Sequence, residues 1–322
     1  MPKKLKILVI RFSSIGDIVL TTPIIRCLKL QKNAEIDFVT KTNYKEIIIS
    51  NPNISEVYCN SRYSKTLEVL RSKDYDIVID LQNNFRSLKL RLQLGVKSYT
   101  YSKNSFKRYL LVYFGINLLN DHIVDRYFTS VKKLNITNDN KGIDYFVNTK
   151  GSNIDFNTEQ DYICWCIGGT YEHKKLSVQQ ITDVISKIEL PILFIGGKAE
   201  RKISSEIINN NKRTNLFDFC GKTSIDESAY LMQKSCLVLT NDTGMMHLAS
   251  AFSVPIISFW GCTKPSLGYS PYFPNIKSQN IITDLSKRPC SKHGNHCRFQ
   301  SQGCIKDIDS NIIFNTVERL LK

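Results

Sequence analysis

The chain has 322 residues, of which 42% are hydrophobic, and its 44 lysines and arginines exceed its 29 aspartates and glutamates to give a net charge of +15. The length predicts two domains, each with its own core, and the charge favours an anionic partner such as nucleic acid, anionic lipid or a phosphorylated glycan. No stretch approaches the roughly 20 apolar residues of a membrane-spanning helix, and the apolar run after the basic start is too short for a signal peptide, so we expect a soluble, cytoplasmic protein.

Short apolar runs rich in β-branched residues alternate with helical patterns along the whole chain. This alternation predicts parallel sheets with crossover helices, and therefore an α/β protein. The predicted strands are residues 6–11, 36–40, 57–59 and 75–80 in the first half, and 162–167, 192–195, 237–240 and 255–259 in the second. The polar residues 147–160 are interpreted as an interdomain linker, and residues 307–322 have helical spacing. We expect domains at 1–155 and 156–322, with a cleft between their sheets.

The turn after the first predicted strand is the first candidate site. Ser13, Ser14 and Gly16 allow the backbone to approach a ligand closely, and Asp17 falls where the next helix begins. Asp17 either presents a functional carboxylate to the cleft or only caps the helix, and the residue types leave both roles open. The Gly-x-Gly-x-x-Gly fingerprint is absent here, which argues against a dehydrogenase.

The second candidate site is residues 240–249, again a strand followed by a turn and a helix start. Unpaired amides at Thr243 and Gly244, together with the positive end of the helix dipole, predict a binding site for a diphosphate. His247 lies one turn further and reaches either the ligand or a backbone carbonyl. Its proximity to Asp242 and Thr243 favours the ligand.

A third element is the loop 167–177, which follows the first predicted strand of the second half. Lys174 in this loop is positioned to neutralise a leaving diphosphate. The alternative is a solvated loop lysine.

Four strings, at 7–23, 80–87, 122–127 and 240–247, resemble in this order the heptosyltransferases of glycosyltransferase family 9. The resemblance extends from about residue 6 to about residue 304, nearly the whole chain. It implies a GT-B fold, in which two Rossmann-like domains with parallel sheets face a central cleft. It also implies inverting transfer of a sugar, in the best-known members heptose from ADP-heptose in lipopolysaccharide biosynthesis, onto a lipopolysaccharide core or related lipid-linked glycan, with no cofactor.

The resemblance also implies roles for individual residues. Asp17 matches the proposed general base, Lys174 the lysine that contacts the diphosphate, and Glu200 an acidic residue that holds the nucleotide ribose. The donor-binding segment corresponds to Asp242, Thr243, Gly244, Met245 and His247, and Ser13, Ser14 and Gly16 join them as substrate-binding residues. The chemistry suits these roles, because a carboxylate takes the proton of the acceptor hydroxyl while amides and a lysine stabilise the leaving diphosphate without a metal.

Two features bear on metal binding. Metal-dependent glycosyltransferases usually present an Asp-x-Asp pair, but the two matches, at 74–76 and 307–309, adjoin predicted element starts and are interpreted as structural. Cys290, Cys297 and Cys304 are spaced Cys-x6-Cys-x6-Cys, which is no standard zinc finger. We interpret them as a loop of free thiols near the donor site, with a bound metal as the alternative, and the other cysteines, Cys262 included, as apolar core residues.

Between residues 81 and 120 the chain has no acidic side chain, but it has basic side chains with aromatic ones interleaved. This stretch is either a surface that receives an anionic lipid-linked acceptor at the inner face of the membrane, through peripheral contact, or an ordinary solvated basic face. No nucleic-acid-binding motif accompanies it, so we do not expect a nucleic-acid partner.

Two other functions remain open from the sequence. One is a sugar-nucleotide epimerase or hydrolase on the same fold, and the other is a non-catalytic anion-binding module. Residues 260–272 replace the more usual family sequence beside the donor helix, so the sequence does not name the sugar.

Overall fold

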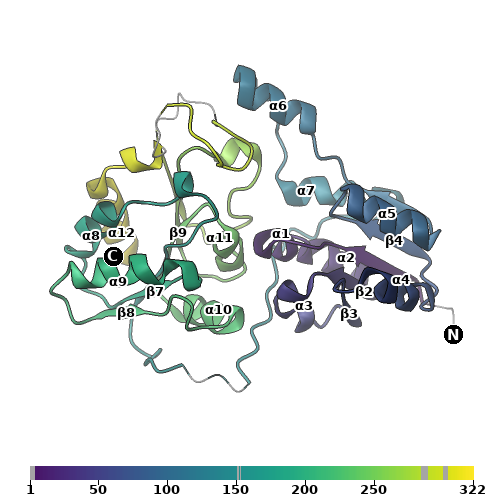
Figure 1. The fold of residues 1–322 in the computed structure, drawn as a ribbon, viewed down its shortest axis with the longest axis horizontal. Coiled ribbons are helices and arrows are strands. Elements are labelled where there is room, and N and C mark those ends of the chain that lie inside the picture. The colour runs from purple at the N-terminus through teal and green to yellow at the C-terminus, as the bar shows by residue number, and fades with distance from the viewer. Residues whose placement is uncertain (1–3, 151, 153, 284–288, 300–303) are drawn as a thin grey trace. The chain divides into compact units, whose positions relative to one another are not determined.

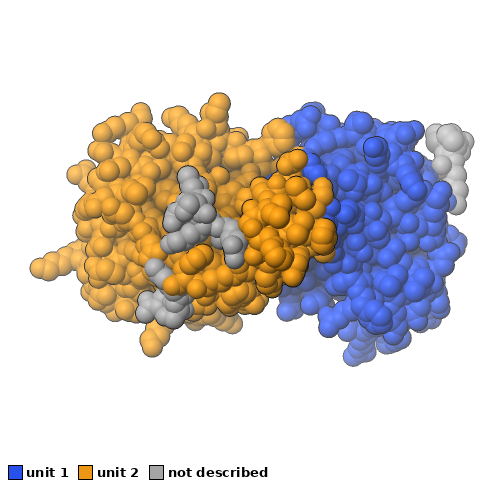
Figure 2. All heavy atoms as spheres, turned by 90° about the horizontal axis from the view of Figure 1, so that it is seen from above, with its two compact units in different colours: residues 1–104, 121–146 blue, residues 105–120, 147–322 orange. Residues whose placement is uncertain are grey.

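The computed structural model describes residues 4–150, 152, 154–283, 289–299 and 304–322. The chain divides into two compact units, shown in different colours in Figure 2. Unit 1 comprises residues 1–104 and 121–146, and unit 2 comprises residues 105–120 and 147–322. None of the described helices combines the length and the apolar character needed to cross a membrane.

Unit 1 is built on a five-stranded sheet in the order β3-β2-β1-β4-β5, in which every pairing is parallel. Its strands are β1 (Lys6–Ile10), β2 (Glu35–Thr40), β3 (Glu56–Cys59), β4 (Ile77–Asp80) and β5 (Ser98–Thr100). Its helices are α1 (Ile15–Val19), α2 (Thr22–Lys32), α3 (Glu46–Ile49), α4 (Tyr63–Arg71), α5 (Phe85–Leu94) and α7 (Ile123–Phe128), with short 3-10 turns at Thr42–Tyr44 and Lys132–Leu134 (Figure 1). β1 lies in the middle of the sheet, since Ile7 pairs with Ile36 on one side and Ile77 on the other, and its residues after Lys6 are all buried.

Unit 2 has a six-stranded parallel sheet in the order β11-β10-β9-β6-β7-β8. Its strands are β6 (Ile163–Cys166), β7 (Ile192–Ile195), β8 (Leu216–Asp218), β9 (Leu237–Asn241), β10 (Ile256–Trp260) and β11 (Gln279–Ile282). Its helices are α6 (Ser105–Phe114), α8 (Val178–Ile185), α9 (Arg201–Asn209), α10 (Ile225–Lys234), α11 (Gly244–Ala249) and α12 (Ser310–Leu321). Short 3-10 turns lie at Glu172–Lys174, Lys198–Glu200, Pro265–Leu267 and Cys304–Asp307.

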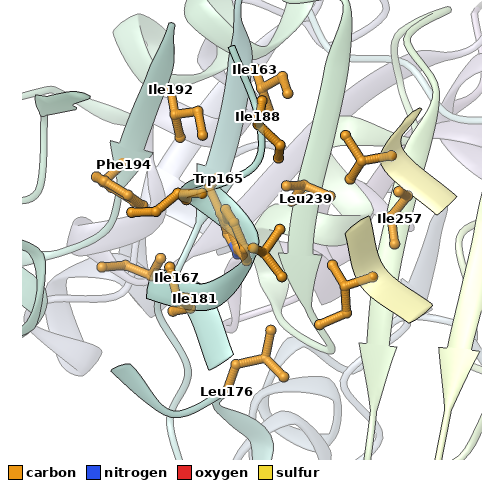
Figure 3. Close-up of a cluster of buried hydrophobic side chains, with 14 of the residues drawn as sticks. Ile163, Trp165, Ile167, Leu176, Ile181, Ile188, Ile192, Phe194, Leu239 and Ile257 are labelled. Atoms are coloured by element: carbon orange, nitrogen blue, oxygen red, sulfur yellow. The ribbon is translucent and has the colours of Figure 1, made fainter. Parts of the chain in front are cut away.

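The core of unit 2 centres on Trp165 in β6, which is fully buried (Figure 3). Its ring lies 6.4 Å from that of Phe194 in β7 and 6.2 Å from that of Phe259 in β10. The last helix, α12, adds Ile313 and Val317 to the same core. This packing holds in place the carboxyl ends of the strands, which the candidate donor residues follow.

The sequence-based strands are confirmed, because each of the eight predicted runs overlaps one of the observed strands, with ends that differ by at most two residues. The helix predicted over 307–322 is present as α12, and residues 147–160 hold no helix or strand in their described part. The prediction missed β5, β8 and β11, which have only three or four residues each.

Residues 105–120 belong to unit 2 although their neighbours in sequence belong to unit 1. Leu111, Val112 and Leu119 form a small apolar cluster with Leu267, against which Tyr269 packs. The guanidinium of Arg108 lies 5.4 Å from the centre of the Tyr269 ring. Helix α6 is therefore anchored to the segment that follows β10.

Candidate donor-binding and catalytic sites

Each sheet has a point where the chain order of its strands reverses. In unit 1 the chain runs outward through β2 and β3 and then resumes at β4 on the other side of β1, and in unit 2 it does the same around β6 and β9. In open parallel sheets, ligands bind at the carboxyl ends of the strands beside such a switch point. The candidate residues of both units follow these strands.

Asp17 lies in the first turn of α1, directly after β1 and the turn at Ser13 and Ser14. One carboxylate oxygen accepts hydrogen bonds from the backbone N–H of Ser14, at 3.2 Å, and from its hydroxyl, at 3.1 Å. The other lies 2.8 Å from the guanidinium of Arg11. The helix-capping role considered for Asp17 is therefore present. Gly16, the residue before it, is buried.

Arg11 is the buried partner that the sequence analysis did not identify. It also donates to the carbonyl oxygens of Ser13, at 2.9 Å, and Leu81, at 2.5 Å. Burial opposes its charge, but the negative charge of Asp17 and the hydrogen bond to it outweigh burial, and the pKa of Arg11 is raised above its usual value. Asp17 thus faces a permanent cation that holds its carboxylate in one orientation.

In unit 2, Lys174 is paired with Asp242. The ammonium lies 2.7 Å from one carboxylate oxygen of Asp242 and 3.2 Å from its backbone carbonyl. The hydroxyl of Thr263 donates to the same carboxylate oxygen at 2.6 Å. With 15% of the Lys174 side chain and 10% of the Asp242 side chain exposed, the alternative of a solvated loop lysine is wrong.

The turn after β9 has the form expected from its sequence. Thr243 is the N-cap of α11 with extended backbone angles, and the helix begins at Gly244. Thr243, Gly244 and Met245 are half-buried, whereas His247 is buried. The first amides of a helix have no partner within it, so this turn directs donors towards the sheet edge.

The ends of β6 and β9 are tied together at this edge. The side-chain amide of Asn241 donates to the carbonyls of Ile167, at 3.2 Å, and Gly168, at 3.0 Å. A side chain at Gly169 would approach the methyl group of Thr243 to 3.7 Å. The loop carrying Lys174 and the turn carrying Thr243 are therefore neighbours.

Glu200 lies at the same edge, after β7, and is buried. Its carboxylate accepts a hydrogen bond from the backbone N–H of Gly197 at 3.0 Å, and its other oxygen lies 3.8 Å from the ammonium of Lys175. A β-carbon at Gly168 would contact this carboxylate at 3.5 Å. Gly168, after β6, and Gly197, after β7, therefore leave room for the Glu200 carboxylate to lie beside the end of β6.

The predicted site residues fall into two groups, each at the carboxyl ends of the strands of one sheet. The group in unit 2 is Lys174, Glu200, Asp242, Thr243, Gly244 and Met245, and the group in unit 1 is Ser13, Ser14, Gly16 and Asp17. The sequence analysis missed Arg11, Thr263 and Lys175. Arg11 and Thr263 shared one signal, a polar side chain within four residues of the carboxyl end of a predicted strand.

The structural interpretation of the two Asp-x-Asp pairs is supported by their hydrogen bonds. Asp76 accepts from the backbone N–H of Lys6 at 2.8 Å, and Asp309 caps α12 through the N–H of Asn311, also at 2.8 Å. Each carboxylate fixes the backbone where an element begins. Cys290, Cys297 and Cys304 gather with Cys262, which the sequence analysis had assigned to the ordinary core.

Comparison with known proteins identifies the family of the chain. The model of the family described as glycosyltransferase family 9 (heptosyltransferase) matches residues 64–300. The chain is 24% identical to lipopolysaccharide heptosyltransferase 1 of Campylobacter coli over 98% of this chain and 99% of that protein.

Solved structures show the same fold. A family 9 glycosyltransferase from Veillonella parvula superposes with a TM-score of 0.81 and 19% identity, covering 100% of this chain and 98% of the other. The Escherichia coli heptosyltransferase WaaC, solved with ADP, gives a TM-score of 0.74 and 18% identity, covering 98% and 100% of the two chains. The two parallel sheets thus match the GT-B arrangement of these enzymes.

Proposed function

Because this chain belongs to glycosyltransferase family 9, it is a glycosyltransferase, and we propose that it moves a heptose from ADP-heptose onto a lipopolysaccharide core or a related lipid-linked glycan. The name of its Campylobacter coli relative supports the heptose and the lipopolysaccharide, and the ADP in the WaaC structure supports the nucleotide. The observation that carries the proposal is the Lys174–Asp242–Thr263 network at the switch point of the unit 2 sheet.

The donor diphosphate would bind at the turn between β9 and α11. Amides at Thr243, Gly244 and Met245 face a ligand there, and the nearby ammonium of Lys174 supplies positive charge. Lysine has three N–H donors and directs two of its contacts to Asp242. Asp242 and Thr263 therefore act by positioning the ammonium. Glu200 would accept the ribose hydroxyls, and His247 would line the same donor pocket.

Asp17 is the proposed general base. The acceptor hydroxyl loses its proton to the Asp17 carboxylate as its oxygen forms a bond to the anomeric carbon. The bond from that carbon to the diphosphate oxygen breaks, the electron pair leaves with ADP, and attack from the opposite face inverts the configuration. Ser13, Ser14 and Gly16 would bind the substrate beside the base.

This chemistry needs no metal at the diphosphate. Negative charge grows on the leaving oxygen, and fixed donors aimed at that oxygen stabilise it at little reorganisation cost. Lys174 and the α11 amides are such donors. No other cofactor takes part in the proposed reaction.

The acceptor is proposed to be an anionic lipid-linked glycan, met by peripheral contact with a membrane. The side chains of Phe106, Tyr109, Tyr113 and Phe114 on α6 are exposed, and Lys107 is exposed among them. Aromatic and basic side chains on one helix suit the interface of an anionic bilayer.

Calorimetric titration with ADP, UDP, GDP and CDP tests the donor site. We expect selective binding of ADP, with the same affinity when Mg²⁺ or freshly added EDTA is present. Preference for another nucleotide would change the sugar donor, and no binding by folded protein would contradict the transferase proposal. Turnover of the donor in the absence of any acceptor would point instead to an epimerase or hydrolase.

A further inference from the structure

Four cysteine side chains converge near the loop that carries Lys174. Cys262 follows β10, Cys304 opens the 3-10 turn before α12, and Cys290 and Cys297 lie in the segment between them. The sulfur atoms of Cys262, Cys290 and Cys297 all lie within 4.8 Å of one another. Cys304 belongs to the same cluster, in which it is buried with Cys262 and Cys290.

The spacing of these thiols suits metal ligands better than disulfides. The sulfur atoms of Cys290 and Cys297 are 3.9 Å apart, whereas a disulfide bond is about 2.05 Å long. A tetrahedral ion with metal–sulfur bonds of about 2.3 Å places its ligand sulfurs about 3.8 Å apart. No disulfide joins the ten cysteines of the chain.

A hydroxyl donor and a buried cation accompany the group. Cys262, Cys290 and Cys304 are buried, and the hydroxyl of Thr283 donates to the Cys304 sulfur at 3.5 Å. Lys264, two residues after Cys262, is also buried and adds a positive charge to this part of the chain. A cation here offsets part of the −2 charge that four thiolates and a divalent ion would carry.

The backbone is also built to hold the four sulfurs together. The N–H of Cys290 donates to the carbonyl of Cys262 at 2.8 Å. A β-carbon at Gly261 would meet Ile305 at 2.6 Å, so only glycine lets the Cys304–Ile305 segment pack against residue 261. Hydrogen bonding and packing around a ligand set are what orient the ligands of a metal site.

We propose that Cys262, Cys290, Cys297 and Cys304 bind one thiophilic divalent ion, zinc or iron, in a closed tetrahedral site. Four protein ligands leave no open position, so the ion is structural and takes no part in the transfer. This site is separate from the diphosphate, for which the proposed mechanism uses no metal.

The ion would hold the Cys290–Cys297 loop against the donor site. Gly294, at the centre of this loop, has a φ of +80°, and a β-carbon there would lie 2.5 Å from the Lys174 side chain. The carbonyl of Lys292 accepts a hydrogen bond from Arg108 of α6 at 3.4 Å. Through these contacts the site would fix Lys174 on one side and α6 on the other.

Metal analysis of the full chain, purified under reducing conditions without chelators, tests the site. We expect about one zinc or iron per chain in the wild type and in a Cys59→Ser control, whose half-buried cysteine lies in unit 1. Cys290→Ser and Cys297→Ser should lower the content several-fold. A wild-type content no higher than that of these variants would overturn the proposal.

Cobalt substitution of the wild type gives a second readout that does not depend on variants folding. Thiolate-to-cobalt charge-transfer bands, with the strong visible bands of tetrahedral Co²⁺, are expected after exchange. Octahedral spectra, or rapid formation of disulfides with no cobalt retained, would contradict the tetrahedral site. A visible thiolate–iron absorption in the purified protein would identify iron as the native ion.

The effect on the donor site is measured separately. If the ion holds the Cys290–Cys297 loop against Lys174, Cys297→Ser should weaken ADP binding. We expect a loss of roughly 10-fold, the size of effect found when residues that support a metal site are removed. Cys59→Ser should leave ADP binding unchanged. This arm rests on the proposed function. If the wild type binds no ADP, the proposed donor site fails, and the metal content still decides the metal site.

Discussion

Asp17 carries a structural role that is observed and a chemical role that is proposed. Its carboxylate caps the turn at Ser14 and pairs with the buried Arg11, so its removal disturbs the backbone as well as any proton transfer. An amide in its place keeps the shape and accepts the Ser14 hydrogen bond, but it takes up no proton. The two roles can therefore be separated by comparing Asn with Ala at this position.

We expect Asp17→Asn and Asp17→Ala to lower kcat by at least a factor of about 100, the low end for general-base catalysis. The affinity for ADP should stay within about twofold in the Asn variant, because the donor residues lie in unit 2. Steady-state kinetics and calorimetry measure the two quantities. Wild-type turnover in Asp17→Asn would remove this residue from the mechanism and leave only its role as a cap.

Lys174 makes a second prediction at the residue scale. Replacing it with methionine keeps the length of the side chain but removes the charge beside the α11 turn. A charge-assisted hydrogen bond contributes about 1.5–3 kcal/mol, so ADP binding should weaken roughly 10- to 100-fold. Lys187→Met is the matched control, since the Lys187 ammonium contacts Asn311 and the ring of Phe314, neither of which is a candidate site residue. Equal affinities in the two variants would place the diphosphate elsewhere.

At the scale of elements, the sequence predicted all the central strands and also the edge strand β3, whose last three residues, Val57, Tyr58 and Cys59, form a short apolar run. β1, β4, β6 and β7 are continuous apolar runs, which mark a central parallel strand directly. β5 and β11 lie at sheet edges, are three or four residues long and begin with polar side chains, so their sequences resemble loops.

The candidate site was predictable where it followed strand ends and not where it depended on tertiary packing. The turn at Asp17 and the turn at Thr243 are local features with their own sequence signals. The association of Cys262 with Cys290, 28 positions away, depends on how β10 and the chain after β11 pair, and spacing alone does not contain it.

Helix α2 is joined to a distant part of the chain by ion pairs whose contribution to stability can be tested. Arg26 donates to both oxygens of Asp139, at 2.8 and 2.7 Å, and also pairs with Asp144 at 2.5 Å, which ties α2 to the chain beyond α7. The hydrogen bonds from Arg26 hold the pKa of Asp139 below its usual value. Such a carboxylate stabilises the folded chain above its unfolded pKa, about 3.9, and the contribution disappears as the pH falls through the folded pKa.

Asp139→Asn should therefore lower the free energy of unfolding by about 2 kcal/mol near neutral pH, and the difference from the wild type should shrink below about pH 4. Urea unfolding at several pH values measures both effects. Glu159→Gln, which replaces an exposed carboxylate in the linker, should change neither. A difference that is constant down to acidic pH would show that the Asn variant acts through packing and not through the charge of Asp139.

At the scale of the whole molecule, a net charge of +15 should attract the chain to any anionic surface. If net charge alone causes the attraction, removing a positive charge should weaken membrane binding by the same amount at any exposed position. A docking surface on α6 would instead make binding depend on Lys107, which is exposed among the exposed rings of Phe106 and Tyr109. The two explanations therefore differ in a pair of variants with the same change of charge.

We expect Lys107→Glu to weaken binding to vesicles of anionic lipid by about 2 kcal/mol, since each basic residue near such a surface contributes about 1 kcal/mol and the substitution changes the charge by two. Lys202→Glu on α9, an exposed site in the same unit, should have a much smaller effect. Cosedimentation measures both, and raising the ionic strength from about 0.1 M to about 1 M shortens the Debye length from about 10 to about 3 Å, which should abolish the electrostatic share. Equal losses in the two variants would mean that net charge, and not the aromatic and basic face of α6, brings the enzyme to the membrane.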